Sequence, residues 1–126
     1  MEKQGQRTGK QISEPTDFII DQAGPSGLFG VFEDDGETGY LYLYEPEGAG
    51  VVKHLQIYNS SMALGVKPED VQVVWSSDGQ KCGVVIWNGF RGIIDLTRNE
   101  EGRVKLTSRQ SPPINDPKWL EGFDTP

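Results

Sequence analysis

The sequence predicts a mainly β fold, or a β-rich α+β fold, in which an antiparallel meander of about six to seven short strands precedes a short C-terminal helical turn. The 126 residues include 16 glycines and 8 prolines, which favour tight turns over long helices. Apolar runs rich in valine and isoleucine alternate with Asp78-Gly79 and Asn88-Gly89, dipeptides that readily supply the positive φ angles of hairpin turns. A chain of this length forms one domain with a single core.

The clearest strand pattern lies in residues 71–96. A turn centred on Asp78-Gly79 pairs three residues of one strand with three of the next: Val71 with Ile86, Val73 with Val84 and Trp75 with Cys82. All six side chains then lie on one face of the hairpin. Because they are all apolar, we expect this face to belong to the core.

The next turn allows two interpretations. A two-residue loop at Asn88-Gly89 places Arg91 and Asp95 on the core face beside Ile93. A three-residue loop over residues 87–89, with Gly89 in a β-bulge, instead brings this set to the core face: Phe90, Gly92, Ile94 and Leu96. We favour the bulge. It leaves Arg91 and Asp95 on the opposite face with Val85 and Trp87, where they can pair with each other or with a partner.

The N-terminal third begins with a polar, basic stretch, residues 1–13, which is expected to be a flexible arm before a β-rich domain at 14–110. Residues 16–21 predict a first strand that ends at Gly24-Pro25. A second hairpin flanks Asp35-Gly36, and a two-residue turn there pairs Val31 with Tyr40 and Phe29 with Tyr42. The opposite side of this hairpin is the expected core face: Leu28, Phe32, Leu41 and Leu43.

The remaining elements are shorter. Residues 51–62 fit a helix or a strand, and we favour a strand. A turn at 68–70 leads into the central strands, and a polar turn at 98–102 leads to a last strand at 104–107. Residues 111–126 predict a linker and one helical turn, with Asp116 as its cap and Pro117 at its first position. The aromatic and apolar residues around this turn are expected to seal one end of the sheet: Trp119, Leu120 and Phe123.

Charge and composition exclude several classes of function. The chain has 19 acidic and 12 basic residues, a net charge of -7 and a pI of about 4.6. This balance opposes nucleic-acid binding, which needs clustered cations, and favours a basic protein partner. The single cysteine, Cys82, excludes an internal disulfide and is expected to be a small buried side chain. No segment has the length and apolarity of a membrane span or a signal peptide, so we expect a cytoplasmic protein.

We expect no catalytic site, no cofactor and no metal site. The one histidine, His54, has no nucleophile or ligand partner in a known motif. Asp95 is the best candidate for carboxylate catalysis, with Arg91 or His54 as its helper, because apolar neighbours raise a carboxyl pKa. The favoured alternative is a strand-end aspartate held by Arg91 or a backbone donor. The acidic run at residues 33–37 lacks the alternating ligand spacing of a calcium loop.

The acidic hairpin and the tyrosines that follow it form the predicted partner-binding site. Carboxylates steer a basic partner and aromatic side chains supply contact area. The carboxylates are Glu33, Asp34, Asp35 and Glu37, and the tyrosine anchors are Tyr40, Tyr42 and Tyr44. The alternative is a second buried face with the tyrosine hydroxyls at its rim.

Several segments resemble a family of small bacterial domains without established function. They are residues 75–81 (WSSDGQK), 84–86 (VVI), Asn88-Gly89 and 93–96 (IIDL), with 30–40 (GVFEDDGETGY) and 57–59 (IYN) upstream. The resemblance covers residues 27–96 and implies a bacterial, non-catalytic domain, but it assigns no functional residue. The composition is also similar to that of immunity proteins that neutralise toxins. Our first hypothesis is therefore an immunity protein; the alternatives are a self-associating accessory domain and a small-molecule binder or carboxylate hydrolase.

Overall fold

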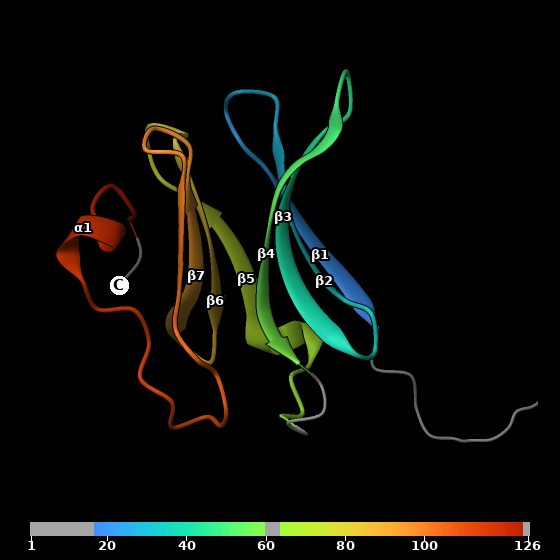
Figure 1. Cartoon of the computed structure of the whole chain (residues 1–126), viewed down its shortest axis with the longest axis vertical. Coiled ribbons are helices and arrows are strands. Elements are labelled where there is room, and N and C mark those ends of the chain that lie inside the picture. The colour runs from blue at the N-terminus through green and yellow to red at the C-terminus, as the bar shows by residue number, and fades with distance from the viewer. Residues whose placement is uncertain (1–16, 60–63, 125–126) are drawn as a thin grey trace, which may run out of the picture.

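The computed structural model describes residues 17–59 and 64–124, and these form two four-stranded antiparallel sheets packed face to face (Figure 1). The predicted mainly β fold is confirmed, with eight strands in the described residues rather than six or seven. Sheet A contains β1 (Phe18–Ala23), β2 (Phe29–Asp34), β3 (Thr38–Glu45) and β4 (Gly50–Asn59). Sheet B contains β5 (Val71–Trp75), β6 (Lys81–Ile86), β7 (Gly89–Asp95) and β8 (Glu100–Arg103). The 3₁₀ turn η2 (Pro68–Asp70) precedes β5 where a turn was predicted, and α1 (Pro117–Leu120) follows sheet B.

The main core lies between the two sheets. Sheet A contributes Phe32, Leu41 and Leu43, and sheet B contributes the inward side chains of β6 and β7, all fully buried. The predicted core face of the second hairpin is therefore confirmed. The sheets approach closely at Gly30, where an added Cβ would overlap the sulfur of Cys82. This close packing makes the two sheets a rigid scaffold.

The hairpin around Asp78-Gly79 has the predicted register. Val71 pairs with Ile86, Val73 with Val84, and Trp75 with Cys82. Gly79 adopts a φ of 74°, which a glycine reaches without steric cost. Cys82 is buried as predicted, and this burial raises the pKa of its thiol to about 12.

The turn after β6 differs from the prediction. It is a two-residue loop of Trp87 and Asn88, both at positive φ, so Gly89 already pairs with Ile86. The bulge exists, but it lies opposite the Val84/Val85 step, where Arg91 is the extra residue of β7. As a result Phe90 lies on the outer face of sheet B rather than in the main core. Gly92 and Ile94 keep the predicted inward positions.

Arg91 and Asp95 do not pair with each other, which was one of the possibilities that the sequence left open. The Arg91 side chain is only 2% exposed, and it donates hydrogen bonds to the carbonyls of Ile86 and Ser111. Asp95 is buried at the end of β7, where it accepts from the Arg98 amide and lies 3.8 Å from the Arg98 Nε. Asp95 is therefore the strand-end aspartate of the favoured alternative, held by a backbone donor.

The second hairpin, formed by β2 and β3, turns over four residues rather than two. Val31 pairs with Tyr42 and Phe29 with Tyr44, two positions away from the predicted register. The turn is lengthened by side-chain hydrogen bonds, because Asp34 accepts from the Gly36 amide and Asp35 accepts from the amides of residues 37 and 38. A slip of two residues leaves every side chain on its predicted face.

The three remaining strand predictions have different outcomes. The first strand, predicted at residues 16–21, forms at Phe18–Ala23. Residues 50–59 form a strand, as favoured, and the rest of the predicted segment lies outside the described residues, as does the predicted arm at 1–13. The last strand is Glu100–Arg103, so its prediction at residues 104–107 is wrong. Asn99 reverses the chain early, at a φ of 56°. After the strand, Val104 and Leu106 leave the sheet and pack into different clusters.

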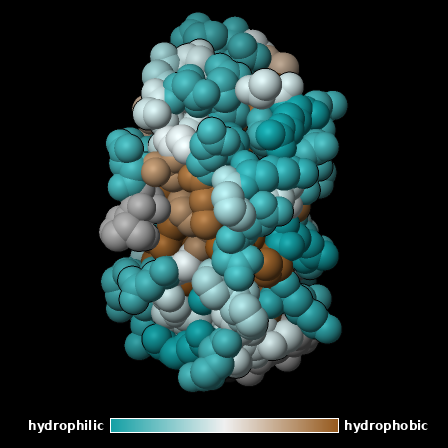
Figure 2. Space-filling model, turned by 90° about the vertical axis from the view of Figure 1, so that its left-hand side faces the viewer, coloured by the Kyte–Doolittle hydropathy of each residue, from teal (hydrophilic) through white to brown (hydrophobic). Residues whose placement is uncertain are grey.

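The C-terminal segment covers the outer face of sheet B. The α1 turn has the predicted cap, in which Asp116 accepts from the Lys118 amide. Trp119 and Leu120 of α1, with Phe123 after it, pack on this face rather than at a sheet end. They form a cluster with Phe90, Ile93 and Ile114. Figure 2 shows this side of the molecule, where an apolar area remains in the middle of hydrophilic surroundings.

Candidate functional site

The predicted tyrosine anchors lie together on the outer face of sheet A, the face turned away from sheet B. The inward positions of Leu41 and Leu43 fix this arrangement, because side chains alternate along β3. Tyr40 lies between Glu33 of β2 and Gln56 of β4, and Tyr42 lies between Val31 and His54. We call this surface the tyrosine face and define it by Val31, Glu33, Tyr40, Tyr42, Tyr44 and His54.

The tyrosine face is partly open to solvent. Tyr40 and Tyr42 are half-buried, whereas Tyr44 is 41% exposed. Exposed aliphatic side chains lie on both flanks, with Ile19 of β1 59% exposed and Val51 of β4 55% exposed. The described C-terminal segment packs on the other sheet. Among the described residues, the tyrosine face is therefore an accessible aromatic surface rather than a second buried core.

Two contacts fix the rings of the tyrosine face. The Tyr42 hydroxyl donates to a carboxylate oxygen of Glu33 at 3.1 Å. Burial raises the pKa of Tyr42, and the hydrogen bond and charge of Glu33 add to this shift. Tyr40 meets the edge of the exposed His54 ring at a centroid distance of 6.4 Å. The face therefore presents aromatic rings in defined positions, with a carboxylate at its margin.

The predicted acidic residues have different locations. Asp35 and Glu37 lie exposed at the hairpin tip, and the amides of Glu37 and Thr38 lower the pKa of Asp35 by hydrogen bonding its carboxylate. Asp34 instead points inward, is only 4% exposed and accepts a hydrogen bond from the Tyr58 hydroxyl. Asp34 is therefore an interior residue, the exposed carboxylates of the predicted set are Asp35 and Glu37, and Glu33 is half-buried beside Tyr42.

The residues considered for catalysis do not share a site. His54 lies on the outer face of sheet A, Asp95 is buried at the end of β7, and Arg91 is held beside Ser111. No group of three or more histidine, cysteine, aspartate or glutamate side chains within residues 17–59 and 64–124 is placed to hold a metal ion. The fold does not assemble the arrangement that a hydrolase based on Asp95 requires.

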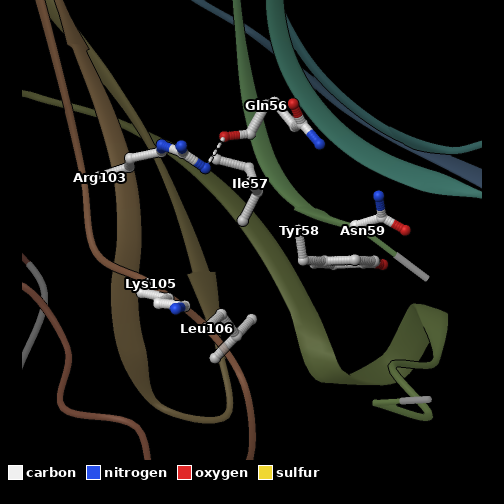
Figure 3. Close-up of a pocket in the computed structure, with 7 residues that line it drawn as sticks. All are labelled: Gln56, Ile57, Tyr58, Asn59, Arg103, Lys105 and Leu106. Atoms are coloured by element: carbon white, nitrogen blue, oxygen red, sulfur yellow. Dashed lines mark hydrogen bonds between the residues drawn. The ribbon is translucent and has the colours of Figure 1, made fainter. Parts of the chain in front are cut away.

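A cleft that the sequence did not indicate lies between the end of β4 and the chain after β8 (Figure 3). Its volume is about 410 Å³, and Arg103 crosses it to donate a hydrogen bond to the Gln56 carbonyl at 3.2 Å. The hydroxyl of Tyr58, one of its lining residues, is already bonded to the buried Asp34. The complete lining is Gln56, Ile57, Tyr58, Asn59, Arg103, Lys105 and Leu106.

Sequence reasoning found the aromatic centre of the tyrosine face but missed its aliphatic flanks. Ile19, Val51 and Val52 carry no functional signature, and only the strand order shows that they border the same surface. The β-branched pair Val51-Val52 was the one sequence feature that could have indicated these flanks, because it lies near the start of the strand that pairs with the tyrosine strand β3.

Comparison with known proteins gives one match. Residues 15–121 match the profile of a family described as an uncharacterized protein conserved in bacteria (DUF2251). No curated protein and no solved structure matches the chain. None of the helices in the described residues is long and apolar enough to span a membrane.

Proposed function

The chain belongs to the DUF2251 family of uncharacterized bacterial proteins, and we propose that it is a non-enzymatic module that binds another protein. The membership agrees with the resemblance predicted from residues 27–96. The observation that carries the proposal is the tyrosine face, which combines accessible aromatic rings with exposed aliphatic flanks on a rigid sheet. Tyrosine and other aromatic residues are enriched in protein interfaces, where they supply area at low entropic cost.

The partner is basic in this proposal. Glu33 borders the tyrosine face, and Asp35 and Glu37 extend from the adjoining hairpin tip. The chain as a whole carries a net charge of -7. Carboxylates around an aromatic patch accelerate the approach of a positively charged protein, while the rings provide most of the contact after docking.

The most concrete form of the proposal is an immunity protein that binds a cognate toxin domain and blocks its active site. A rigid scaffold, aromatic anchors and steering charges are the properties that such an inhibitor needs. The cytoplasmic location expected from the sequence is part of this proposal. The best candidate partner is the protein encoded by the adjacent gene, because a toxin and its inhibitor must be produced together.

The test is co-purification with that adjacent gene product, followed by binding kinetics at several salt concentrations. The double variant Asp35→Lys/Glu37→Lys should slow association about tenfold and flatten its salt dependence. Glu121→Lys/Asp124→Lys makes the same change of net charge beside sheet B and serves as the matched control. Equal association rates for the two double variants would remove the hairpin tip from the interface.

Self-association is the second candidate function. It is favoured by β4, an end strand of sheet A that carries the exposed Val51 and Val52. Sedimentation equilibrium at high protein concentration separates the two functions. A stable homodimer that excludes the adjacent gene product would support self-association, and a monomer at every concentration would exclude it.

A further inference from the structure

One edge of the tyrosine face is the strand β4, which is unusually long and pairs within sheet A on one side only. It spans residues 50–59, and within residues 17–59 and 64–124 its sole neighbour in the sheet is β3. Its register with β3 skips Val52 and Ile57, which are the extra residues of two irregular steps. The opposite edge of such a strand carries backbone donors and acceptors directed away from the sheet.

The direction of these backbone groups follows from one hydrogen bond. The Gln56 carbonyl accepts from Arg103, which belongs to the other sheet, so it points away from β3 (Figure 3). Pairing with β3 is regular from Gln56 to His54. In an antiparallel ladder the backbone groups of alternate residues point to the same side. The N–H and C=O of His54 therefore also point outward, whereas those of Leu55 point to β3.

The two halves of this edge differ. At the C-terminal half, the Gln56 carbonyl already accepts a hydrogen bond from Arg103. At the N-terminal half, Val51, Val52 and His54 are exposed, and the exposed Tyr44 lies beside Val51 on β3. The side chain of Lys53 is directed across to β8, where it lies 3.5 Å from Glu101. The N-terminal half is thus an open backbone edge bordered by apolar side chains.

We infer that residues 50–54 of β4 form a β-augmentation site, at which an extended, basic segment of the partner protein adds a fifth strand to sheet A. This inference rests on the proposed function and specifies how the partner is held. Backbone hydrogen bonds to His54 supply affinity, and the side chains of the added strand extend the tyrosine face. The added strand also buries Val51 and Val52, whose exposure is otherwise unfavourable.

Charge complementarity selects a basic segment. Glu45 is the last residue of β3, Glu47 lies in the connection that leads into β4, and Glu33 lies at the far margin of the tyrosine face. A second copy of this chain would instead bring two chains of net charge -7 together at this edge. The partner segment is therefore expected to carry lysine or arginine residues at the end that lies beside Glu45 and Glu47.

The first test removes a single backbone donor. His54→Pro eliminates the outward N–H without removing a hydrogen bond to β3, and His54→Ala makes a similar side-chain loss while keeping the N–H. We expect His54→Pro to bind the adjacent gene product at least about tenfold more weakly than His54→Ala does. In wild-type protein, hydrogen exchange at the His54 amide should slow in the complex. Equal affinity of the two variants would overturn the inference.

A second pair of variants leaves the backbone unchanged, in case the proline impairs folding. Val52→Arg places a cation at the edge and should weaken binding of a basic segment, whereas Val52→Glu should not. Equal binding of these two variants would exclude a basic occupant. A wild-type homodimer that His54→Pro abolishes and His54→Ala retains would identify a second copy as the occupant and also overturn the inference.

The failure of this inference can be told from the failure of the proposed function. If Tyr42→Ala weakens binding while His54→Pro and His54→Ala bind with equal affinity, the tyrosine face binds the partner without strand addition. If Tyr42→Ala, Asp35→Lys/Glu37→Lys and His54→Pro all bind as the wild type does, the proposed interface is wrong as well. The same conclusion follows if the adjacent gene product does not bind at all.

Discussion

The outer faces of the two sheets both carry apolar and aromatic side chains, but they differ in how far other parts of the chain cover them. On sheet B every residue of β7 is buried, and the C-terminal segment packs against Phe90 and Ile93. On sheet A the tyrosine face stays half-open, although it also carries aromatic and aliphatic side chains. In the part of the chain that the structure describes, the C-terminal segment packs on the outer face of sheet B, and the outer face of sheet A stays accessible. Aromatic residues on the outer face of sheet B are therefore part of a packed cluster, whereas the tyrosines on the outer face of sheet A keep part of their surface exposed.

The largest expected effect tests the role of the covered face in folding. Phe90 is buried against Phe123, with ring centroids 4.7 Å apart. Phe90→Ala should lower the free energy of unfolding by about 3 kcal/mol, because it removes buried area and leaves a cavity. Tyr44→Ala, the matched truncation on the open face, should cost less than about 1 kcal/mol. Urea denaturation of both variants checks the difference, and similar losses would contradict the contrast between the faces.

The second prediction addresses the role of the open face in binding. Tyr42→Ala should weaken binding of the adjacent gene product by about 2 kcal/mol, or roughly thirtyfold, as expected for a central aromatic anchor. Tyr42→Phe keeps the ring and loses only the hydrogen bond to Glu33, so most of the affinity should remain. Titration calorimetry separates these cases. If Tyr42→Phe loses as much affinity as Tyr42→Ala, the hydroxyl and not the ring is the important group.

The contrast between the faces was only partly predictable from sequence. Alternation along β3 placed Leu41 and Leu43 inward and the tyrosines outward, and a register error of two residues could not change that. The hairpin at Asp78-Gly79 was fully predictable, because its turn residues and its flanking pattern agree. In both cases the information is local to a few consecutive residues.

Two of the errors arose where distant residues decide the outcome. The bulge in β7 lies at Arg91, whose side chain is held by the carbonyl of Ser111, twenty positions away. Asp34 appeared to belong to the acidic tip, but its hydrogen-bond partner Tyr58 lies on β4. The division of the strands into two sheets, and hence the selective covering of sheet B, depends on such long-range contacts and leaves no local pattern.

A third prediction concerns the contacts that hold the C-terminal segment on the outer face of sheet B. The amino group of Lys81 donates to the carbonyls of Lys118, Trp119 and Glu121, at 3.0, 3.3 and 2.9 Å. Lys81→Met should lower the free energy of unfolding by about 1 kcal/mol, because these carbonyls lose a charged donor while the aliphatic stem is kept. Limited proteolysis should then cleave the C-terminal segment faster. Unchanged cleavage would show that the apolar contacts of Trp119, Leu120 and Phe123 are sufficient to hold the C-terminal segment on sheet B.

The smallest expected effect is on the loss of folding stability at alkaline pH. It compares Tyr58 in the interior with Tyr42 on the open face. Burial raises the pKa of Tyr58 and, with less burial, that of Tyr42, and a carboxylate hydrogen bond adds to each shift. Because the folded-state pKa exceeds the unfolded value of about 10, each neutral hydroxyl contributes stability that is complete below pH 10 and declines as pH rises above it. Tyr58→Phe should therefore reduce the alkaline loss of stability more than Tyr42→Phe does. Thermal unfolding between pH 8 and about 11 measures this difference, with Cys82 contributing equally in both variants. An equal reduction in the two variants would mean that the tyrosine face is as shielded from solvent as the space between the sheets.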